Sequence, residues 1–193
     1  MNIFYLDKSP STCAVYHNDK HTVKMILEYA QLLSTAHRVL DGVPVVSRRA
    51  TTGRQYTSYR LDDNRDAVLY SATHINHPSA IWCRQSIANY DWLHSLLVEL
   101  CKEYTYRYGK VHKCERDGLV KLLGIYPKNL KPRSFTEPTP AMPDDVKVLG
   151  NSLESYRNYY IKNKSKLASW SGKINSRPIP EWYQKGDNYV SAL

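Results

Sequence analysis

The stretch 16–31, YHNDKHTVKMILEYAQ, combines two histidines, two lysines and two acidic residues with an apolar helical pattern. Apolar residues recur at helical spacing from Ala14 to Leu33, and neither proline nor glycine interrupts residues 11–40. Ser9 and Pro10 are typical of a helix cap and first helical residue. The sequence therefore predicts one long helix over residues 10–40.

The polar residues of this helix gather on one side. At about 100° per residue they fall within an arc of roughly 100°. They are Lys20, His21, Lys24, Glu28, Gln31, Thr35 and Arg38. A solvated helix face is one interpretation, but such a face usually alternates glutamates with lysines. Here a single carboxylate, Glu28, lies among cations and uncharged polar groups, which favours a functional site.

A zinc site is the next alternative for this helix. His17 and His21 are four residues apart and can share one face, as in the HExxH motif. The catalytic glutamate of that motif would fall at position 18, where Asn18 stands. Lys20 and Lys24 would also repel a cation. We therefore expect no metal.

The chain as a whole is basic and rich in tyrosine. Its 193 residues carry a net charge of +9 and include 16 tyrosines but two phenylalanines. This composition favours a partner with phosphate groups, and we expect DNA, most simply as a duplex. A basic surface that only keeps the protein in solution is the alternative.

Other features of the sequence limit where the protein can be located and which chemistry it can carry out. No apolar run approaches the roughly 18 residues of a membrane span, and no secretory signal is recognisable, so we expect a cytoplasmic protein that does not enter a membrane. The sequence contains neither a P-loop nor GxGxxG, and we expect no cofactor. Four widely spaced cysteines without a CxxC pair are expected to be reduced and structural; they are Cys13, Cys83, Cys101 and Cys114.

Residues 41–75 differ from the preceding helix. Gly42 and Pro44 end the helical pattern, and the following residues have no clear period. Five arginines make this segment a basic loop or insertion, either a mobile connection or an arm that follows a nucleic-acid backbone. These are Arg48, Arg49, Arg54, Arg60 and Arg65.

Helical patterns return after this segment. A second long helix is predicted from a cap at Asn76 to Tyr108, where Gly109 ends it, and a short helix over 116–123 follows. The proline-rich stretch 126–145 reads as a connection, and a third long helix is predicted over 147–170. The sum is an all-α fold over residues 1–193. It is a single domain of three long helices plus short ones, with the basic insertion and a proline-rich crossover.

Three landmarks along the chain resemble one known family. Asp19 and His21 precede Glu28 on the first helix, His77 opens the stretch HPSAIWCRQSIANYDWL, and RPIPEWYQKG stands at 177–186. Their order is similar to that of the pyrimidine-dimer DNA glycosylases typified by bacteriophage endonuclease V, which are small, basic, all-α proteins. The DKHxxKxxxE run also resembles uncharacterised phage and bacterial proteins grouped with them. The resemblance implies a phage DNA-acting enzyme.

The resemblance implies roles for particular residues. Glu28 takes the position of the catalytic glutamate, which stabilises charge on the opening sugar as an N-glycosidic bond breaks. His21 and Lys24 would complete the catalytic group, and aromatic rings would hold the extruded nucleotide. The expected DNA contacts are Lys20, Gln31, Arg38, Arg48, Arg49, Arg54, His77, Arg84, Asn89, Arg107 and Lys110.

One departure leaves alternatives open. The family's nucleophile is the α-amino group of a small residue exposed when the initiator methionine is removed, whereas residue 2 here is Asn2. The amine of Met1, one residue out of register, or of Lys20 or Lys24 could replace it. Without such an amine the protein would be a glycosylase that does not cut the strand. It could instead alter the base, or only bind nucleic acid or a host factor that acts in defence.

Overall fold

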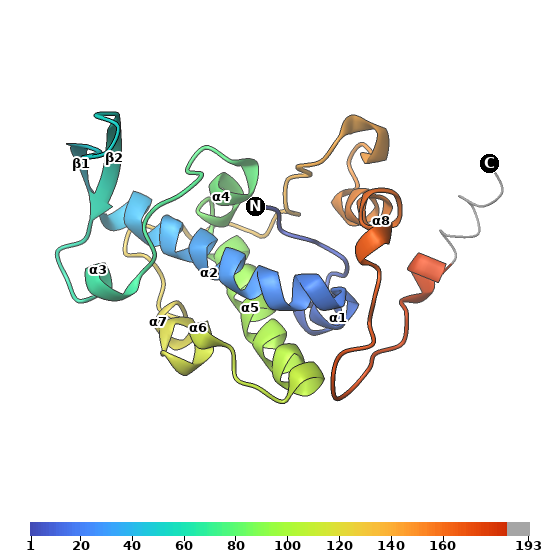
Figure 1. Cartoon of the computed structure of the whole chain (residues 1–193). Coiled ribbons are helices and arrows are strands. Elements are labelled where there is room, and N and C mark those ends of the chain that lie inside the picture. The colour runs from blue at the N-terminus through green and yellow to red at the C-terminus, as the bar shows by residue number, and fades with distance from the viewer. Residues whose placement is uncertain (185–193) are drawn as a thin grey trace.

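The computed structural model describes residues 1–184 and is mostly helical, with one two-stranded sheet. Two helices of more than twenty residues, α2 and α5, cross near the middle of the molecule (Figure 1). The elements in chain order are α1 (Pro10–Tyr16), α2 (Asp19–Asp41), β1 (Val43–Arg48), β2 (Gln55–Arg60), α3 (Arg65–Val68), α4 (Pro78–Cys83), α5 (Ile87–Tyr108), α6 (Lys113–Arg116), α7 (Leu119–Leu122), η1 (Asp144–Val146), α8 (Ser152–Asn163) and η2 (Ser165–Leu167).

The core lies where α2 packs against α5 and α4, and α1 packs against α5. The apolar stripe of α2 supplies Met25, Ile26 and Leu33, and that of α5 supplies Leu93 and Leu97, all fully or almost fully buried. Burial of such side chains stabilises a fold by about 1.5–3 kcal/mol each. The stripe predicted for α5 is thus confirmed, whereas that of α2 is confirmed in part, because the predicted members Val23 and Leu27 are exposed.

An extended N-terminal segment lies along α2. Residues 3–6 are buried, and the backbone N–H of Phe4 donates to the Tyr29 hydroxyl at 3.1 Å. Near the end of the segment, Trp92 Nε1 of α5 donates to the carbonyl of Lys8 at 2.8 Å. The N-terminus itself is drawn beside α4 (Figure 1).

The first predicted helix is two helices. The start at Ser9 and Pro10 is confirmed, but α1 ends at Tyr16, and α2 begins at Asp19. Asn18 lies between them in extended conformation, and its side chain accepts the backbone N–H of His21 at 2.9 Å. Asparagine prefers such a capping position to a helix interior, which explains the break.

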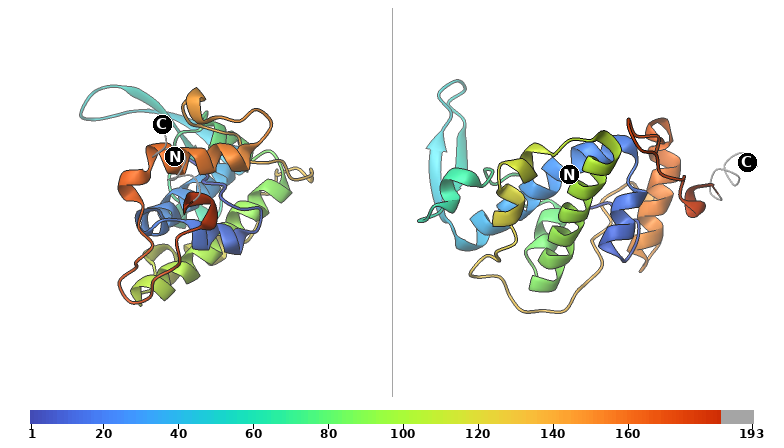
Figure 2. Two further views of the ribbon diagram at one scale, coloured as in Figure 1. Left: turned by 90° about the vertical axis from the view of Figure 1, so that its right-hand side faces the viewer. Right: turned by 90° about the horizontal axis from the view of Figure 1, so that it is seen from below.

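The prediction that the basic insertion is a loop is wrong. It forms an antiparallel hairpin whose register runs from Val43↔Arg60 to Arg48↔Gln55, followed by α3. Every residue of β1 except the half-buried Ser47 is exposed, as is most of β2. A strand that is wet on both faces shows no alternation of apolar and polar residues. The hairpin projects from the end of α2 (Figures 1 and 2).

The second predicted helix is also interrupted. His77, rather than Asn76, caps α4, and Ser86 caps α5 by accepting the N–H of Asn89 at 3.0 Å. The predicted end at Gly109 is confirmed, since this residue has a left-handed φ of 64°.

The remaining helices are shorter than expected. The predicted helix 116–123 is the two short turns α6 and α7, and the third long helix is the 12-residue α8 followed by η2. The all-α prediction with three long helices is therefore corrected to a mostly helical fold with two long helices and a hairpin. The last residues of the predicted C-terminal landmark, 185 and 186, lie outside the described residues.

Two further observations concern burial. All four cysteines are free and buried, and burial raises the pKa of the Cys13 thiol to about 12, which suits a structural role. Within residues 1–184, no helix combines the length and the apolar character that a membrane crossing needs.

Candidate functional site

Glu28 lies on the α2 face that carries the predicted polar residues. Its side chain is 15% exposed, and its Oε1 lies 3.0 Å from Lys24 Nζ, one turn earlier and largely in solvent. The pair is an ordinary i,i+4 contact, worth about 0.3–0.5 kcal/mol. Glu28 is therefore partly exposed and lies next to an amine.

His77 marks the other side of Glu28. Burial lowers the pKa of His77, and the α-amino group of Met1 and the His74 ring lower it further, whereas Glu28 raises it. All three groups are thus within electrostatic range of this ring. His77 Nδ1 accepts the N–H of Ser79 at 3.2 Å, so the neutral ring carries its proton on Nε2. Glu28 thus has the Lys24 amine beside it, and it acts electrostatically on His77, as the Met1 α-amino group also does.

His21 is not part of this group. Its ring stacks on Phe4 at 4.2 Å between centroids, and Nδ1 lies 2.5 Å from the Tyr160 hydroxyl. Burial lowers its pKa to about 3, with smaller effects of His17 and nearby lysines. The expected catalytic role of His21 is corrected to that of a neutral core residue that joins the N-terminal segment to α8.

His17, the other histidine of the possible zinc pair, is also part of the core. Both ring nitrogens of His17 are engaged, Nδ1 with the carbonyl of Cys13 at 2.7 Å and Nε2 with the Tyr29 hydroxyl at 2.9 Å. Within residues 1–184, no group of three or more His, Cys, Asp or Glu side chains is arranged to hold a metal ion.

Arg38 is structural, contrary to the expectation of a DNA contact. It is 6% exposed, and all five of its N–H groups donate at 2.6–2.8 Å. The acceptors are the carbonyls of Tyr59, Asp66, Leu69 and Tyr70 and the Asp66 carboxylate. No donor remains for a phosphate, and Arg38 instead fastens the hairpin and α3 to α2.

We expect Arg38→Lys to lower the free energy of unfolding by about 2–3 kcal/mol, because one ammonium cannot satisfy five buried acceptors. Denaturant unfolding measures the change. Arg48→Lys, on the exposed hairpin, is the matched control and should stay within about 0.5 kcal/mol of wild type. Equal effects of the two substitutions would contradict the structural role.

Arg107 and Asn89 were also expected to contact DNA, and both are structural instead. Arg107 is 0% exposed and donates to Glu103, Asp19 and the carbonyls of Val15 and His17, which ties α5 to the α1–α2 corner. Asn89 is buried and exchanges hydrogen bonds with Thr136, fixing the proline-rich connection to α5. Neither side chain can reach DNA without breaking these hydrogen bonds.

The other expected DNA contacts differ in their surroundings. Arg84 is half-buried and donates to the carbonyl of Ile75 at 2.8 Å, so part of its guanidinium is committed to the backbone. Lys20 is exposed and Gln31 half-buried on α2. Lys110 is exposed just beyond the far end of α5, away from the hairpin (Figure 1). Only Lys20 and Gln31 lie on the same helix as Glu28.

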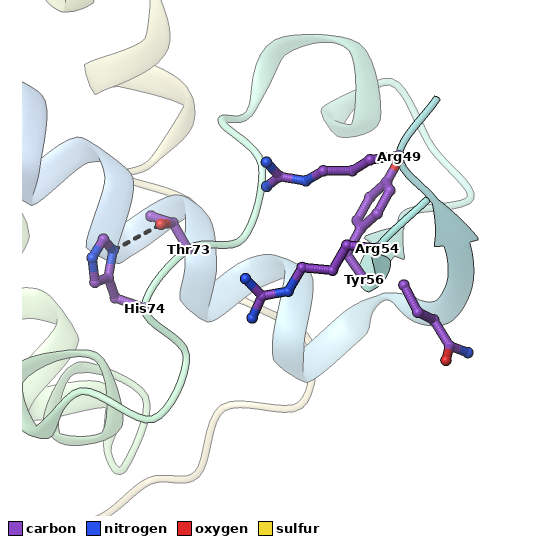
Figure 3. A pocket seen from close by; sticks show the side chains of 6 residues that line it. Arg49, Arg54, Tyr56, Thr73 and His74 are labelled. Carbon is purple, nitrogen blue, oxygen red and sulfur yellow. Dashed lines mark hydrogen bonds between the residues drawn. The ribbon is translucent and has the colours of Figure 1, made fainter. Parts of the chain in front are cut away.

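The exposed hairpin arginines border a cavity of about 590 Å³. Arg49 and Arg54 extend from the hairpin towards Thr73 and His74, and Tyr56 lies between them and the strand (Figure 3). Its lining is Arg49, Arg54, Gln55, Tyr56, Thr73 and His74. We call these six residues the hairpin pocket.

Sequence reasoning missed Tyr56, Thr73 and His74 as site residues. His74 has a φ of 48°, and among the described residues it is the one non-glycine with positive φ. A histidine in this conformation is uncommon, and nothing in the local sequence indicates it. The hairpin, which brings Tyr56 to Thr73, was itself not predicted.

Comparisons with known proteins add no relative. No protein-family model matches the chain, and no significant match was found among curated proteins or solved structures. The geometry of Glu28 and its surroundings is therefore the basis for assigning a function. This geometry suits stabilisation of a cation and attack by an amine.

Proposed function

We propose that this protein is a DNA N-glycosylase that acts on an extruded damaged or modified nucleotide, with Glu28 as the catalytic carboxylate. The observation that carries the proposal is the partly exposed Glu28 carboxylate, which lies 3.0 Å from Lys24 Nζ. Glu28 and the Met1 α-amino group both act electrostatically on His77. A net charge of +9 and the exposed hairpin arginines favour a polyanionic substrate. The resemblance to the pyrimidine-dimer glycosylases agrees with this chemistry.

The proposed reaction uses an amine and a carboxylate. The amine attacks C1′ of the sugar as the C1′–N bond breaks, and the electron pair of that bond leaves with the base. The amine releases one proton to the departing base. A proton from solvent then passes to the ring oxygen as the C1′–O4′ bond breaks with its electron pair on that oxygen, which opens the sugar to an iminium ion. Glu28 stabilises the positive charge that develops at C1′. Lys24 and Met1 are the two candidate amines.

The test is incubation with duplex DNA that carries a panel of damaged and modified bases, with borohydride present. We expect base release and a covalent adduct, because borohydride reduces an iminium to a stable amine. Mass spectrometry of the adduct identifies Met1 or Lys24 as the attached residue. Base release without an adduct would leave a glycosylase that uses water, and the absence of both would overturn the proposal.

A binding module without chemistry is the second candidate. The exposed Arg48, Arg49 and Arg54 favour it, since binding a backbone needs nothing from Glu28. Such a module would keep its DNA affinity in Glu28→Gln and lose it when these arginines are changed, and no substrate would be released.

A further inference from the structure

The hairpin pocket combines two guanidinium groups with polar groups of a second segment. Arg49 and Arg54 have no ion-pair partner among the described residues, whereas nearby Arg60 and Arg38 both pair with Asp66. The neighbouring carboxylate is thus already used. Two unpaired guanidinium groups that converge on a hydroxyl and an imidazole form a site for an anion, and phosphate matches their planar donors.

The far wall of this pocket is held rigidly. The backbone N–H of Thr73 donates to Thr35 Oγ1 of α2 at 3.2 Å, and the carbonyl of His74 accepts the N–H of His77, the cap of α4, at 2.8 Å. Thr73 Oγ1 lies 2.8 Å from His74 Nδ1. The surroundings therefore fix His74 in its left-handed conformation, which costs about 1 kcal/mol or more and occurs preferentially at ligand sites.

The opposite wall is a pair on the hairpin. The guanidinium carbon of Arg49 lies 5.9 Å from the centre of the Tyr56 ring, at the outer limit of a cation–π contact, and 43% of Tyr56 is exposed. The arginine is thus positioned near the ring without its donors being used. Its N–H groups stay available to the cavity.

The pocket is attached to the same helix as Glu28. Thr35, which holds Thr73, follows Glu28 by seven residues on α2, which corresponds to about 10 Å of helix at 1.5 Å per residue. Successive nucleotides of a stacked strand are spaced by about 3.4 Å. A strand that places its target nucleotide at Glu28 would therefore reach the pocket with a phosphate a few nucleotides away.

From this arrangement we propose that the hairpin pocket binds a DNA backbone phosphate a few nucleotides from the target base. Arg49 and Arg54 hold the phosphate oxygens, and Thr73 and His74 close the site from the α2 side. The proposal rests on the proposed function for the position of the target nucleotide. On this proposal the hairpin determines which nucleotide of the bound DNA strand lies at Glu28.

The first experiment compares variants by the salt dependence of binding to a fluorescent duplex with one abasic-site analogue at its centre. For the double variant Arg49→Gln/Arg54→Gln we expect the slope of log K against log salt to become shallower by about 0.9 for each phosphate that the protein no longer neutralises. Arg116→Gln/Lys121→Gln on α6 and α7 removes the same charge on the other side of α2 (Figure 1) and should leave the slope unchanged. Equal changes in both variants would overturn the proposal.

The second experiment locates the phosphate. Single phosphates of the duplex are replaced in turn by uncharged methylphosphonates. Wild type should bind more weakly when the replacement lies at one position a few nucleotides from the abasic site, and Arg49→Gln/Arg54→Gln should be indifferent to that replacement. Identical position profiles for the two proteins, or inorganic phosphate binding while DNA affinity ignores both arginines, would overturn the proposal.

The outcomes separate this proposal from the proposed function. A wild-type protein that binds the duplex with a slope unaffected by Arg49 and Arg54 overturns the pocket alone. A wild-type protein that does not bind DNA overturns both. Circular dichroism of each variant verifies folding, which exposed substitutions should preserve.

Discussion

Glu28→Gln is expected to lower the rate of base release by about 10²–10⁴-fold while leaving the affinity for DNA unchanged. Glutamine keeps the shape of the side chain but carries no charge to stabilise the cationic sugar. Single-turnover measurements on the substrate found in the panel give the rate, and anisotropy gives the affinity. Because the side chain makes one partly exposed ion pair, folding should change by less than about 0.5 kcal/mol.

Two matched variants identify the cause of that reduced rate. Glu28→Asp keeps the charge but withdraws it by one methylene, so its rate should lie between those of Glu28→Gln and wild type. Lys24→Gln removes the amine that lies 3.0 Å from Glu28. If this variant still yields a borohydride adduct, Met1 carries the reaction, and if it does not, Lys24 does. Full activity of Glu28→Gln would exclude the carboxylate from catalysis.

The accessible position of Glu28 could be predicted because it depends on one helix. Glu28, Lys24 and Lys20 share a face by the helical period, and the structure keeps that face open at Glu28. His21 shares the same face, yet Phe4 and Tyr160, from segments remote in sequence, cover it. Helical periodicity indicates which side chains point in one direction, but not which of them another segment covers.

The arginines show the same limit more clearly. Arg38 and Arg54 are chemically identical, but one is surrounded by five acceptors and the other is exposed. The acceptors of Arg38 come from β2 and from the segment around α3, more than twenty residues along the chain. Because the hairpin has no apolar alternation, its path back over α2 could not be predicted, nor could the pocket it forms.

Acid should destabilise the protein strongly, because the folded protein buries histidines in their neutral form. Burial lowers the pKa of His17 and His37 to about 4 and that of His21 to about 3. His37 is held between the Tyr90 hydroxyl and the guanidinium of Arg65, so a proton on its Nδ1 would displace a donor and face a cation. All three rings are hydrogen-bonded in neutral form and have little access to water.

The direction in which the free energy of unfolding changes with pH follows from proton binding. An unfolded histidine has a pKa of about 6.5, so below that pH the unfolded chain takes up protons that the folded chain cannot. The free energy of unfolding should be nearly constant above pH 7. Between about pH 6 and pH 4 it should fall by up to about 4 kcal/mol per pH unit for the three groups together. The three groups together would remove about 6 kcal/mol by pH 5, so a domain at the lower end of ordinary stability, about 5 kcal/mol, would unfold near that pH.

Denaturant unfolding at a series of pH values from neutral to mildly acidic measures this slope. His21→Gln removes one of the three protonation sites, and its slope should be smaller by about 1.4 kcal/mol per pH unit, whatever the substitution does to stability at neutral pH. Lowered carboxyl pKa values act in a lower pH range; for Asp19, burial is outweighed by hydrogen bonds from Ser169, Gly172 and Arg107. A stability that does not change between pH 7 and pH 5 would show that the buried rings accept protons without unfolding.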